Sequence, residues 1–237
     1  MLEVKKIYKS IKGKNIIENI SFEVDLGEIF GLLGPNGAGK TSTFYIIAGI
    51  TQADKGNIMF ANKNISNLPM HIRSDYGLKY LPQEPSVFAN LTVYENLYGL
   101  AELTFNKKED INKFIDSSIE EFSLSKILKM RGRQLSGGQR RKVEIARTLA
   151  TKPKIILLDE PFAGIDPIAI EDIKNVLKKL SVNKIGILIT DHNVRETLEI
   201  CNNAAIINDG KIIAKGDTQN LIKNDLVKKV YLGDMYS

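Results

Sequence analysis

The feature that most constrains the fold is a glycine-rich stretch near the N-terminus, between an apolar run and a helix-prone segment. It reads G-x-x-x-x-G-K-[ST], the pattern of a phosphate-binding P-loop (residues 34–41), and it follows the apolar residues 29–33. Glycines let the backbone curl so that successive N–H groups converge on an anion. The lysine supplies a charge for the β- and γ-phosphates, and the hydroxyl after it can bind Mg²⁺. The sequence therefore predicts a site for a nucleoside triphosphate, formed by Gly34, Pro35, Asn36, Gly37, Ala38, Gly39, Lys40, Thr41 and Ser42.

Length and composition predict an ordinary globular protein. The 237 residues are 43% hydrophobic and 26% charged, which suits one large α/β domain or a core with a subdomain. No run of about 18 consecutive apolar residues predicts a membrane span. The single cysteine, Cys201, excludes an internal disulfide, and two distant histidines argue against a Cys/His zinc site. We therefore expect a reducing, cytoplasmic environment.

The net charge of +5 raises the question of nucleic-acid binding. The lysines are spread along the chain and mixed with acids, which is typical of a solvated basic surface or one that faces an anionic membrane. The pattern disfavours a DNA-binding groove. The one basic cluster, at residues 131–142, flanks a motif with its own explanation below.

Alternating apolar and polar residues predict an antiparallel sheet around the P-loop. Residues 2–9 and 15–25 read as a hairpin with a turn at Lys12-Gly13, and residues 56–65 read as a further strand pair. Tyr8 lies on the first strand, where its ring could stack on an adenine; a plain sheet-surface tyrosine is the alternative. Residues 78–81, 154–159 and 185–190 predict further strands, the last two typical of a buried parallel sheet.

Residues 92–150 are predicted to be mostly helical. A helix begins after Thr92, and apolar residues recur at helical spacing from 111 to 122. The stretch Leu-Ser-Gly-Gly-Gln (residues 135–139) then precedes another helix and predicts a second loop-to-helix anion site. One subunit has one triphosphate to hold, so we expect this stretch to contact the nucleotide of another subunit. The residues concerned are Ser136, Gly137, Gly138 and Gln139.

Two acids end the apolar strand 154–159, namely Asp159 and Glu160. Ligands of open α/β sheets bind at the carboxyl ends of the strands. Asp159 is placed to hold Mg²⁺ directly or through water, and Glu160 to orient or deprotonate the attacking water. The next buried strand delivers Asp191 and His192 to the same edge, where the imidazole can touch the γ-phosphate and sense its loss. The alternatives are a pair of solvated acids and a structural histidine.

Taken in order, these segments resemble the ATP-binding-cassette (ABC) ATPases. The resemblance spans nearly the whole chain and is carried by residues 34–41, Gln83, 135–139, Asp159-Glu160, Asp166 and His192. It implies an α/β fold: a P-loop NTPase core with a mixed, largely parallel sheet, an N-terminal antiparallel β subdomain and an inserted α-helical subdomain. The core and β subdomain would comprise residues 1–91 and 151–237, and the helical subdomain residues 92–150, within one ABC ATPase domain.

The resemblance also implies a head-to-tail homodimer with two ATP molecules between the P-loops and the signature stretches (residues 135–139). Tyr8 would match the adenine-stacking aromatic residue, and Gln83 the glutamine that contacts Mg²⁺ and water. Glu160 would be the catalytic carboxylate and His192 the switch histidine. Asp166 would communicate across the dimer. The cofactors implied are ATP and Mg²⁺.

Within the superfamily, several segments resemble the ATPase subunits of bacterial lipopolysaccharide exporters: residues 68–71, 81–84, 162–167, 190–197 and 230–233. The last segment also resembles branched-chain amino-acid importer ATPases, which are the alternative. One departure is Ala89-Asn90, where we expect an arginine-bearing stretch in the exporters. The resemblance implies a peripheral protein on the cytoplasmic face of the inner membrane. It would bind integral membrane permease subunits and make no direct contact with the transported substrate.

An apolar groove beside Gln83, lined by Phe88, Leu91 and Tyr94, is expected to take a short helix of the membrane partner. The alternative places these side chains in the core of the helical subdomain. A soluble nucleic-acid-associated ABC ATPase is a further alternative, but such relatives carry coiled-coil arms or two cassettes, so we expect no direct nucleic-acid contact. A small-molecule kinase would explain the P-loop and not the signature stretch.

Overall fold

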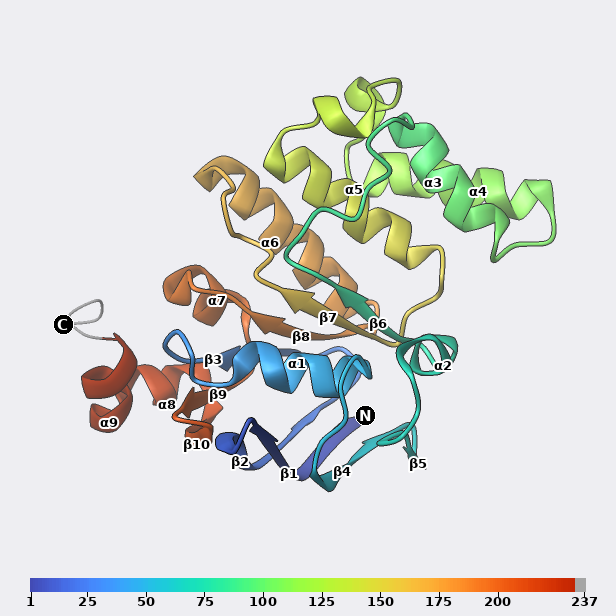
Figure 1. Ribbon diagram of the computed structural model, residues 1–237. Helices are drawn as coiled ribbons and strands as arrows, with labels where there is room; N and C mark the ends of the chain where they lie inside the picture. Colours follow the sequence, from blue (N-terminus) through green and yellow to red (C-terminus); the bar gives the residue numbers. More distant parts are fainter. Residues whose placement is uncertain (233–237) are drawn as a thin grey trace.

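Two sheets organise the computed structural model, which describes residues 1–232 (Figure 1). The antiparallel sheet has the order β2-β1-β4-β5, and the larger sheet the order β10-β9-β3-β8-β7-β6. Strands β9, β3, β8, β7 and β6 are parallel, and β10 pairs antiparallel with β9. The predicted hairpin, strand pair and parallel strands are thereby confirmed. Their bounds are β1 Leu2–Ile11, β2 Lys14–Val24, β3 Ile29–Leu33, β4 Lys55–Phe60, β5 Lys63–Asn64, β6 Leu78–Leu81, β7 Ile155–Asp159, β8 Gly186–Thr190, β9 Asn203–Asn208 and β10 Lys211–Asp217.

The central strands are buried because both faces of the larger sheet are covered. On β7, Ile155 and Leu157 pack into a core shared with the antiparallel sheet, whereas Ile156 and Leu158 pack into the opposite core. Alternate side chains of a strand point to opposite faces, so a strand covered on both sides must be apolar throughout. Helix α1 (Lys40–Ala48) lies between the two sheets, which fixes the P-loop at its N-terminal end (Figure 1).

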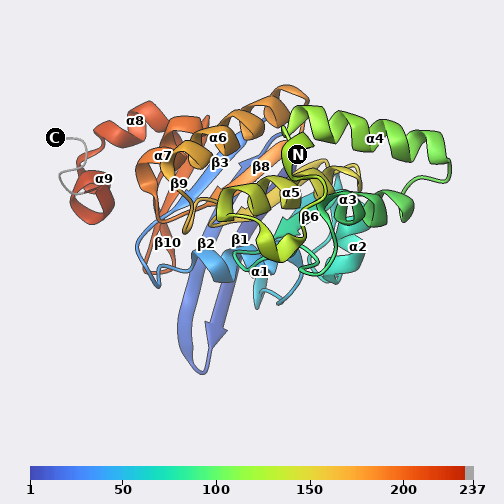
Figure 2. The same cartoon turned by 90° about the horizontal axis from the view of Figure 1, so that it is seen from above.

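The other face of the larger sheet carries α6 (Pro167–Val182) and α7 (Val194–Ile200). Beyond α6 lie α3 (Val93–Glu102), α4 (Lys108–Glu121) and α5 (Gly137–Leu149), at the end of the molecule away from the antiparallel sheet (Figure 1). Seen from above, α3 and α4 lie on one side, α8 and α9 on the other and α5 near the middle, and the β1–β2 hairpin projects past them (Figure 2). The predicted start of α3 is confirmed, since Thr92 and Glu95 form a capping box.

The C-terminal segment from residue 218 forms several short helical elements, not one continuous helix. The structure has α8 (Thr218–Lys223), α9 (Asp225–Val227) and a π-helical turn, Lys228–Leu232. Asn224 takes an extended backbone, and its side chain accepts hydrogen bonds from the amides of Leu226 and Val227, so it starts a new helix. Gly233, the last residue of the C-terminal segment noted above, lies outside the described residues.

Shorter elements complete the chain: α2 (Met70–Asp75) and two 3-10 turns, Ser125–Ile127 and Gly132–Gln134. Across residues 1–232, every helix is too short or too polar to cross a membrane.

Candidate nucleotide-binding and hydrolysis site

The P-loop is pressed between two strands, and this requires its glycines. Gly34 has a φ of +153°, and a Cβ there would lie 2.0 Å from the carbonyl oxygen of Ile207 on β9. Gly39 has a φ of +107°, and its Cβ would lie 2.9 Å from the carbonyl oxygen of Ile16 on β2. Only glycine fits both positions. The loop ends on the first turn of α1, whose amide N–H groups have no intrahelical acceptors and can bind an anion.

Lys40 is buried at the base of this loop, with 6% of its surface exposed. Its ammonium donates to the carbonyl oxygens of Gly34, at 2.7 Å, and Pro35, at 3.0 Å. Burial lowers the pKa of Lys40, and the nearby carboxylates of Glu160 and Asp159 oppose that shift. The cation is therefore held within the loop that would receive the phosphates.

One hollow brings the P-loop together with two of the predicted catalytic residues. It is lined by Lys14, Ile16, Asn36, Gly37, Gly39, Lys40, Thr41, Ser42, Glu160 and His192. Gly34, Pro35 and Ala38 complete the turn of the loop without lining the hollow. The predicted triphosphate site and the predicted water-activating acid thus share one cavity.

The ends of β7 and β8 aim Glu160 at His192. Glu160 has a φ of +46°, and its amide donates to the carbonyl of Thr190 at 2.8 Å. His192 Nε2 lies 2.6 Å from Glu160 Oε1, and the imidazole is 49% exposed. An N–H at this nitrogen donates to the carboxylate, so the histidine can report directly on the charge of the acid.

Asp159 is buried one residue earlier. The Tyr80 hydroxyl donates to its Oδ2 at 3.0 Å. Burial raises the pKa of Asp159, and the hydrogen bond from Tyr80 opposes that rise. Tyr80 was missed by the sequence analysis, although its place on the strand beside β7 could have suggested it.

A second hollow lies on the other side of Glu160, at the N-terminal end of α5. It is lined by Gln83, Pro85, Gly137, Arg140, Arg141, Glu144, Glu160, Pro161, Ala163, Gly164 and Ile165. Ser136 caps α5, since its hydroxyl accepts from the Gln139 amide at 3.3 Å. Of the signature stretch, only Gly137 lines this hollow; it does so together with Gln83, and Glu160 lines both this hollow and that of the P-loop.

Gly138 serves packing. A Cβ at this position would lie 2.3 Å from the Cβ of Ala169 on α6, so the N-terminus of α5 rests directly on α6. This role was not foreseen from the sequence, which treated both glycines of the stretch as parts of an anion site.

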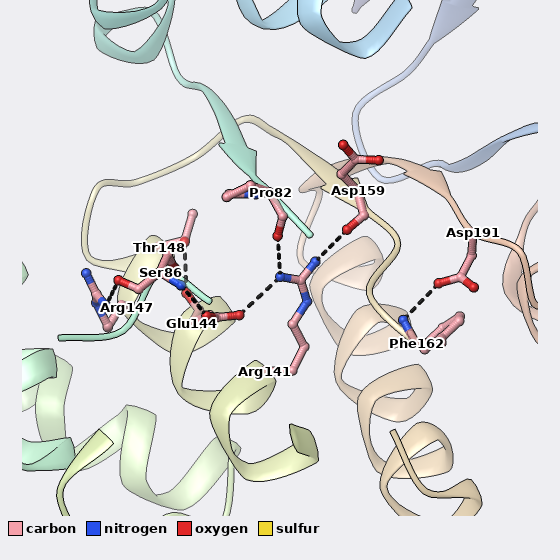
Figure 3. Close-up of polar contacts among 9 residues, drawn as sticks. All are labelled: Pro82, Ser86, Arg141, Glu144, Arg147, Thr148, Asp159, Phe162 and Asp191. Atoms are coloured by element: carbon pink, nitrogen blue, oxygen red, sulfur yellow. Dashed lines mark hydrogen bonds and ion pairs between the residues drawn. The ribbon is translucent and has the colours of Figure 1, made fainter. Parts of the chain in front are cut away.

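Arg141 ties α5 to the ends of two strands (Figure 3). Its Nη1 donates to the carbonyl of Pro82 after β6, at 3.1 Å, and to Glu144, also at 3.1 Å. Its Nη2 donates to the carbonyl of Asp159 at 3.3 Å. A guanidinium presents several donors in a fixed plane, so one side chain can hold three partners.

Two more charged residues of α5 fasten the segment that carries Gln83 (Figure 3). Glu144 accepts from the Ser86 amide at 2.6 Å, and Arg147 donates to the Ser86 carbonyl at 2.8 Å. Arg141, Glu144 and Arg147 were all missed. Their spacing of three residues in a helix that must pack on a sheet was the available signal.

Tyr8 lies away from the P-loop hollow. It lines a separate hollow with Lys5, Lys6, Ser21, Lys55, Gly56 and Asn57. The hairpin residues at the P-loop are Lys14 and Ile16, near the β1–β2 turn. Tyr8 therefore lies in a hollow other than that of the phosphate site, and its predicted stacking on an adenine stays a prediction.

The remaining predicted residues are exposed. Asp166 caps α6, and its Oδ1 accepts from the Ala169 amide at 3.0 Å. Phe88, Leu91 and Tyr94 are 52%, 39% and 41% exposed, so they do not belong to the core of the helical region. These three side chains remain available to a partner.

Comparison with known proteins agrees with this arrangement. The family model described as ABC transporter matches residues 17–163. The fold is similar to that of a nucleotide-free ATP-binding cassette from an ABC transporter, with a TM-score of 0.88 and 29% identity over 98% of this chain and 99% of that one. An ATP-binding cassette in its ADP conformation gives 0.87 and 29% over 98% of each chain. The chain belongs to the ABC transporter family, as an ATPase domain with the α/β P-loop fold.

Particular relatives are more similar still. The chain is 48% identical to the lipopolysaccharide export system ATP-binding protein LptB of Haemophilus influenzae, over 100% of this chain and 98% of that protein. Identity to LptB of Escherichia coli is also 48%, over 98% of this chain and 97% of that protein. LptB of Acidithiobacillus ferridurans is 44% identical over 100% and 98%.

Proposed function

We propose that this chain is the ATP-hydrolysing subunit that powers lipopolysaccharide export from the inner membrane. The observation that carries the proposal is the 48% identity to two LptB proteins over nearly the full length of all three chains. The intact P-loop hollow, with Glu160 and His192 at its edge, supports ATP hydrolysis as the reaction.

In the proposed reaction, the P-loop amides and Lys40 hold the triphosphate. Glu160 orients a water and takes its proton as the water attacks the γ-phosphorus. The bond to the β–γ bridging oxygen breaks, and ADP and phosphate leave. His192, in contact with Glu160, holds that carboxylate in place and touches the γ-phosphate.

The residues beside the P-loop suit Mg²⁺. Asp159 is a buried carboxylate, and within residues 1–232 it forms no salt bridge with a lysine or arginine. No group of three His, Cys, Asp or Glu side chains in the described chain is arranged to hold a metal ion by itself, so the ion would also use the Thr41 hydroxyl, the Gln83 amide and the phosphates. When bound, Mg²⁺ neutralises charge on the β- and γ-phosphates.

Two copies of the chain would share each nucleotide. Gly137 of the signature stretch lines a different hollow from the one that the P-loop of its own chain lines. In a head-to-tail homodimer, Ser136, Gly137, Gly138 and Gln139 would complete the partner's site, with Asp166 beside them as the contact between the two sites. Tyr8 stays a proposal as the adenine-stacking residue.

The membrane partners would bind the exposed patch of Phe88, Leu91 and Tyr94, called here the partner groove. Binding to integral permease subunits there would place the chain on the cytoplasmic face of the inner membrane. The chain would make no direct contact with the transported lipid. We further propose that residues 92–150 form a helical subdomain inserted into a core formed by 1–91 and 151–237, of which the structure describes the part up to 232.

Purification of the chain with its native membrane, followed by identification of the bound subunits from a detergent extract, tests this function. We expect lipopolysaccharide-export permease subunits, and expect Leu91→Ser to release them. Leu103→Ser is the matched control, because Leu103 is an exposed leucine (85%) at the far end of α3. Recovery of amino-acid permease subunits would contradict the export function and leave the ATPase assignment intact.

A further inference from the structure

A buried lysine joins the two helices that follow the catalytic loops. Lys174, in the middle of α6, has a side chain only 2% exposed. Its ammonium lies 2.8 Å from Glu196 Oε2 and 2.6 Å from Glu199 Oε2, both on α7, and 2.9 Å from Glu171 Oε2 on its own helix. The P-loop mechanism uses none of these four residues.

Lys174 and its three carboxylate partners, Glu171, Glu196 and Glu199, are called the clamp from here on. Burial alone would lower the pKa of Lys174, but its hydrogen bonds to Glu196, Glu199 and Glu171 outweigh burial and raise that pKa above the ordinary value. The lysine is thus charged, and its three donors are all used. A buried charge of this kind tolerates little movement of its partners, because a lost partner leaves the ammonium unsatisfied.

The position of the clamp relates it to His192. Helix α7 begins at Val194, two residues after His192, so the imidazole extends from the N-terminal end of the clamped helix. At that end Asp191 accepts from the Asn193 amide and from the Phe162 amide, both at 2.8 Å; Figure 3 shows the contact with Phe162. The segment that runs from Glu160 through α6 is therefore joined to the segment that runs from Asp191 through α7 at two places. Asp191 bonds to the Phe162 amide before α6, and Lys174 on α6 bonds to Glu196 and Glu199 on α7.

We propose that Lys174 is a positioning residue for ATP hydrolysis, which fixes α7 to α6 and thereby holds the His192 imidazole against Glu160. Asp166 caps the N-terminus of α6, so the same contacts connect the helix that follows Asp166 to the helix that follows His192. This inference rests on the proposed function of His192 and adds the residue that sets its position.

The test separates the bonds that join the helices from the bond within α6. Glu196→Gln with Glu199→Gln removes the inter-helix charges, and Glu171→Gln removes one charge from the same ammonium without touching α7. The full-length chain is labelled with ¹³C-histidine. It has two histidines, so the exposed His71 is an internal reference for His192.

In the double variant we expect the His192 imidazole signal to shift and broaden while His71 is unchanged. The kcat for ATP should fall by about 2- to 30-fold with KM nearly constant, because the phosphate-binding loop is untouched. Glu171→Gln should leave the His192 signal and kcat close to those of the parent. Unchanged His192 signals and kcat in the double variant overturn the proposal and leave the cluster a purely structural bond.

Two further measurements keep the result decisive. If the double variant does not fold, Glu199→Gln alone makes the same comparison, since this carboxylate is 54% exposed. His192→Ala tests the proposed function separately. If its kcat equals that of the parent, the proposed role of His192 fails. The His192 signal of the Glu196/Glu199 double variant still reports whether the clamp positions the imidazole.

Discussion

Glu160 is aimed by its backbone. Its positive φ places it in the left-handed region, which costs a non-glycine residue roughly 1–2 kcal/mol, and the hydrogen bond from its N–H to the Thr190 carbonyl holds it there. Strain of this kind persists at functional sites when the surroundings over-determine the conformation. Here the neighbouring strand β8 supplies both the acceptor for the amide and, two residues later, the imidazole that contacts the carboxylate.

Glu160→Gln tests the residue directly. The amide has the shape of the carboxylate and cannot accept the proton of water, so hydrolysis should slow by roughly 10²–10⁴-fold while ATP binding is retained. Single-turnover hydrolysis and equilibrium ATP binding measure the two separately. Glu84→Gln, an exposed acid next to Gln83, is the control and should turn over normally. Near-normal turnover of the Glu160 variant would remove Glu160 as the base.

At the scale of elements, the close contact between α5 and α6 requires a glycine, because there is no room for a Cβ at Gly138. Gly138→Ala would drive a Cβ into Ala169 and should destabilise the protein by about 1–3 kcal/mol. Gly99→Ala, inside α3 with nothing within 4 Å of its Cβ, should instead stabilise it by about 0.5–1 kcal/mol. Urea unfolding measures both free energies. Equal effects of the two substitutions would contradict the packing role of Gly138.

The pairing of α6 with α7 should depend on pH. The hydrogen bond from Lys174 lowers the pKa of Glu199 below its ordinary value of 4.5. A carboxylate with a depressed folded-state pKa stabilises the fold above its unfolded pKa and loses that contribution as pH falls through the folded value. We therefore expect Glu199→Gln to be less stable than the parent by a constant margin from pH 7 to about pH 5, and the margin to narrow below pH 4.5. Urea midpoints over this range measure it, and a margin that widens on acidification would contradict the pairing.

Some of the strands and helices could be predicted from the sequence, and others could not. Strands and helices with long apolar patterns, such as β7 and α4, are evident from spacing, and the P-loop follows from its motif. The docking point of the β1–β2 hairpin on the P-loop is not evident, because a regular alternation looks the same at every position along a strand; in the structure Lys14 and Ile16 are the hairpin residues that line the P-loop hollow. Nor does spacing reveal that Asn224 caps a new helix, since asparagine is tolerated inside helices as well.

Contacts between distant segments were the least accessible part of the site. Lys174 reads in the sequence as one of several lysines on an amphipathic helix, and only the placement of α7 beside it makes it a buried ion. Arg141 likewise reads as one of a basic run, although in the structure it is 5% exposed and bonded to two strand ends. In both cases burial depends on the tertiary arrangement.

For the whole molecule, the proposed dimer can be tested at the N-cap of α5. Aspartate caps a helix as well as serine does, so Ser136→Asp should keep the fold while adding a negative charge that would face the partner's γ-phosphate. In a Glu160→Gln background with ATP, we expect a dimer by light scattering, and a monomer once Ser136→Asp is added. Thr92→Asp makes the same exchange at the cap of α3 and should leave the dimer intact. Undiminished dimerisation of the Ser136 variant would mean that the subunits do not share the nucleotide.

The separation of the P-loop hollow from the hollow at Gly137 has a genetic consequence. We expect a cell that makes both intact chains and Lys40-defective chains to pair them at random, and each nucleotide site would contain residues of both paired chains. When the two forms are made in equal amounts, about half of the defective chains pair with an intact chain and impair a nucleotide site that the intact chain helps to form. Output should fall more steeply than the share of intact chains, so that such an allele behaves as dominant.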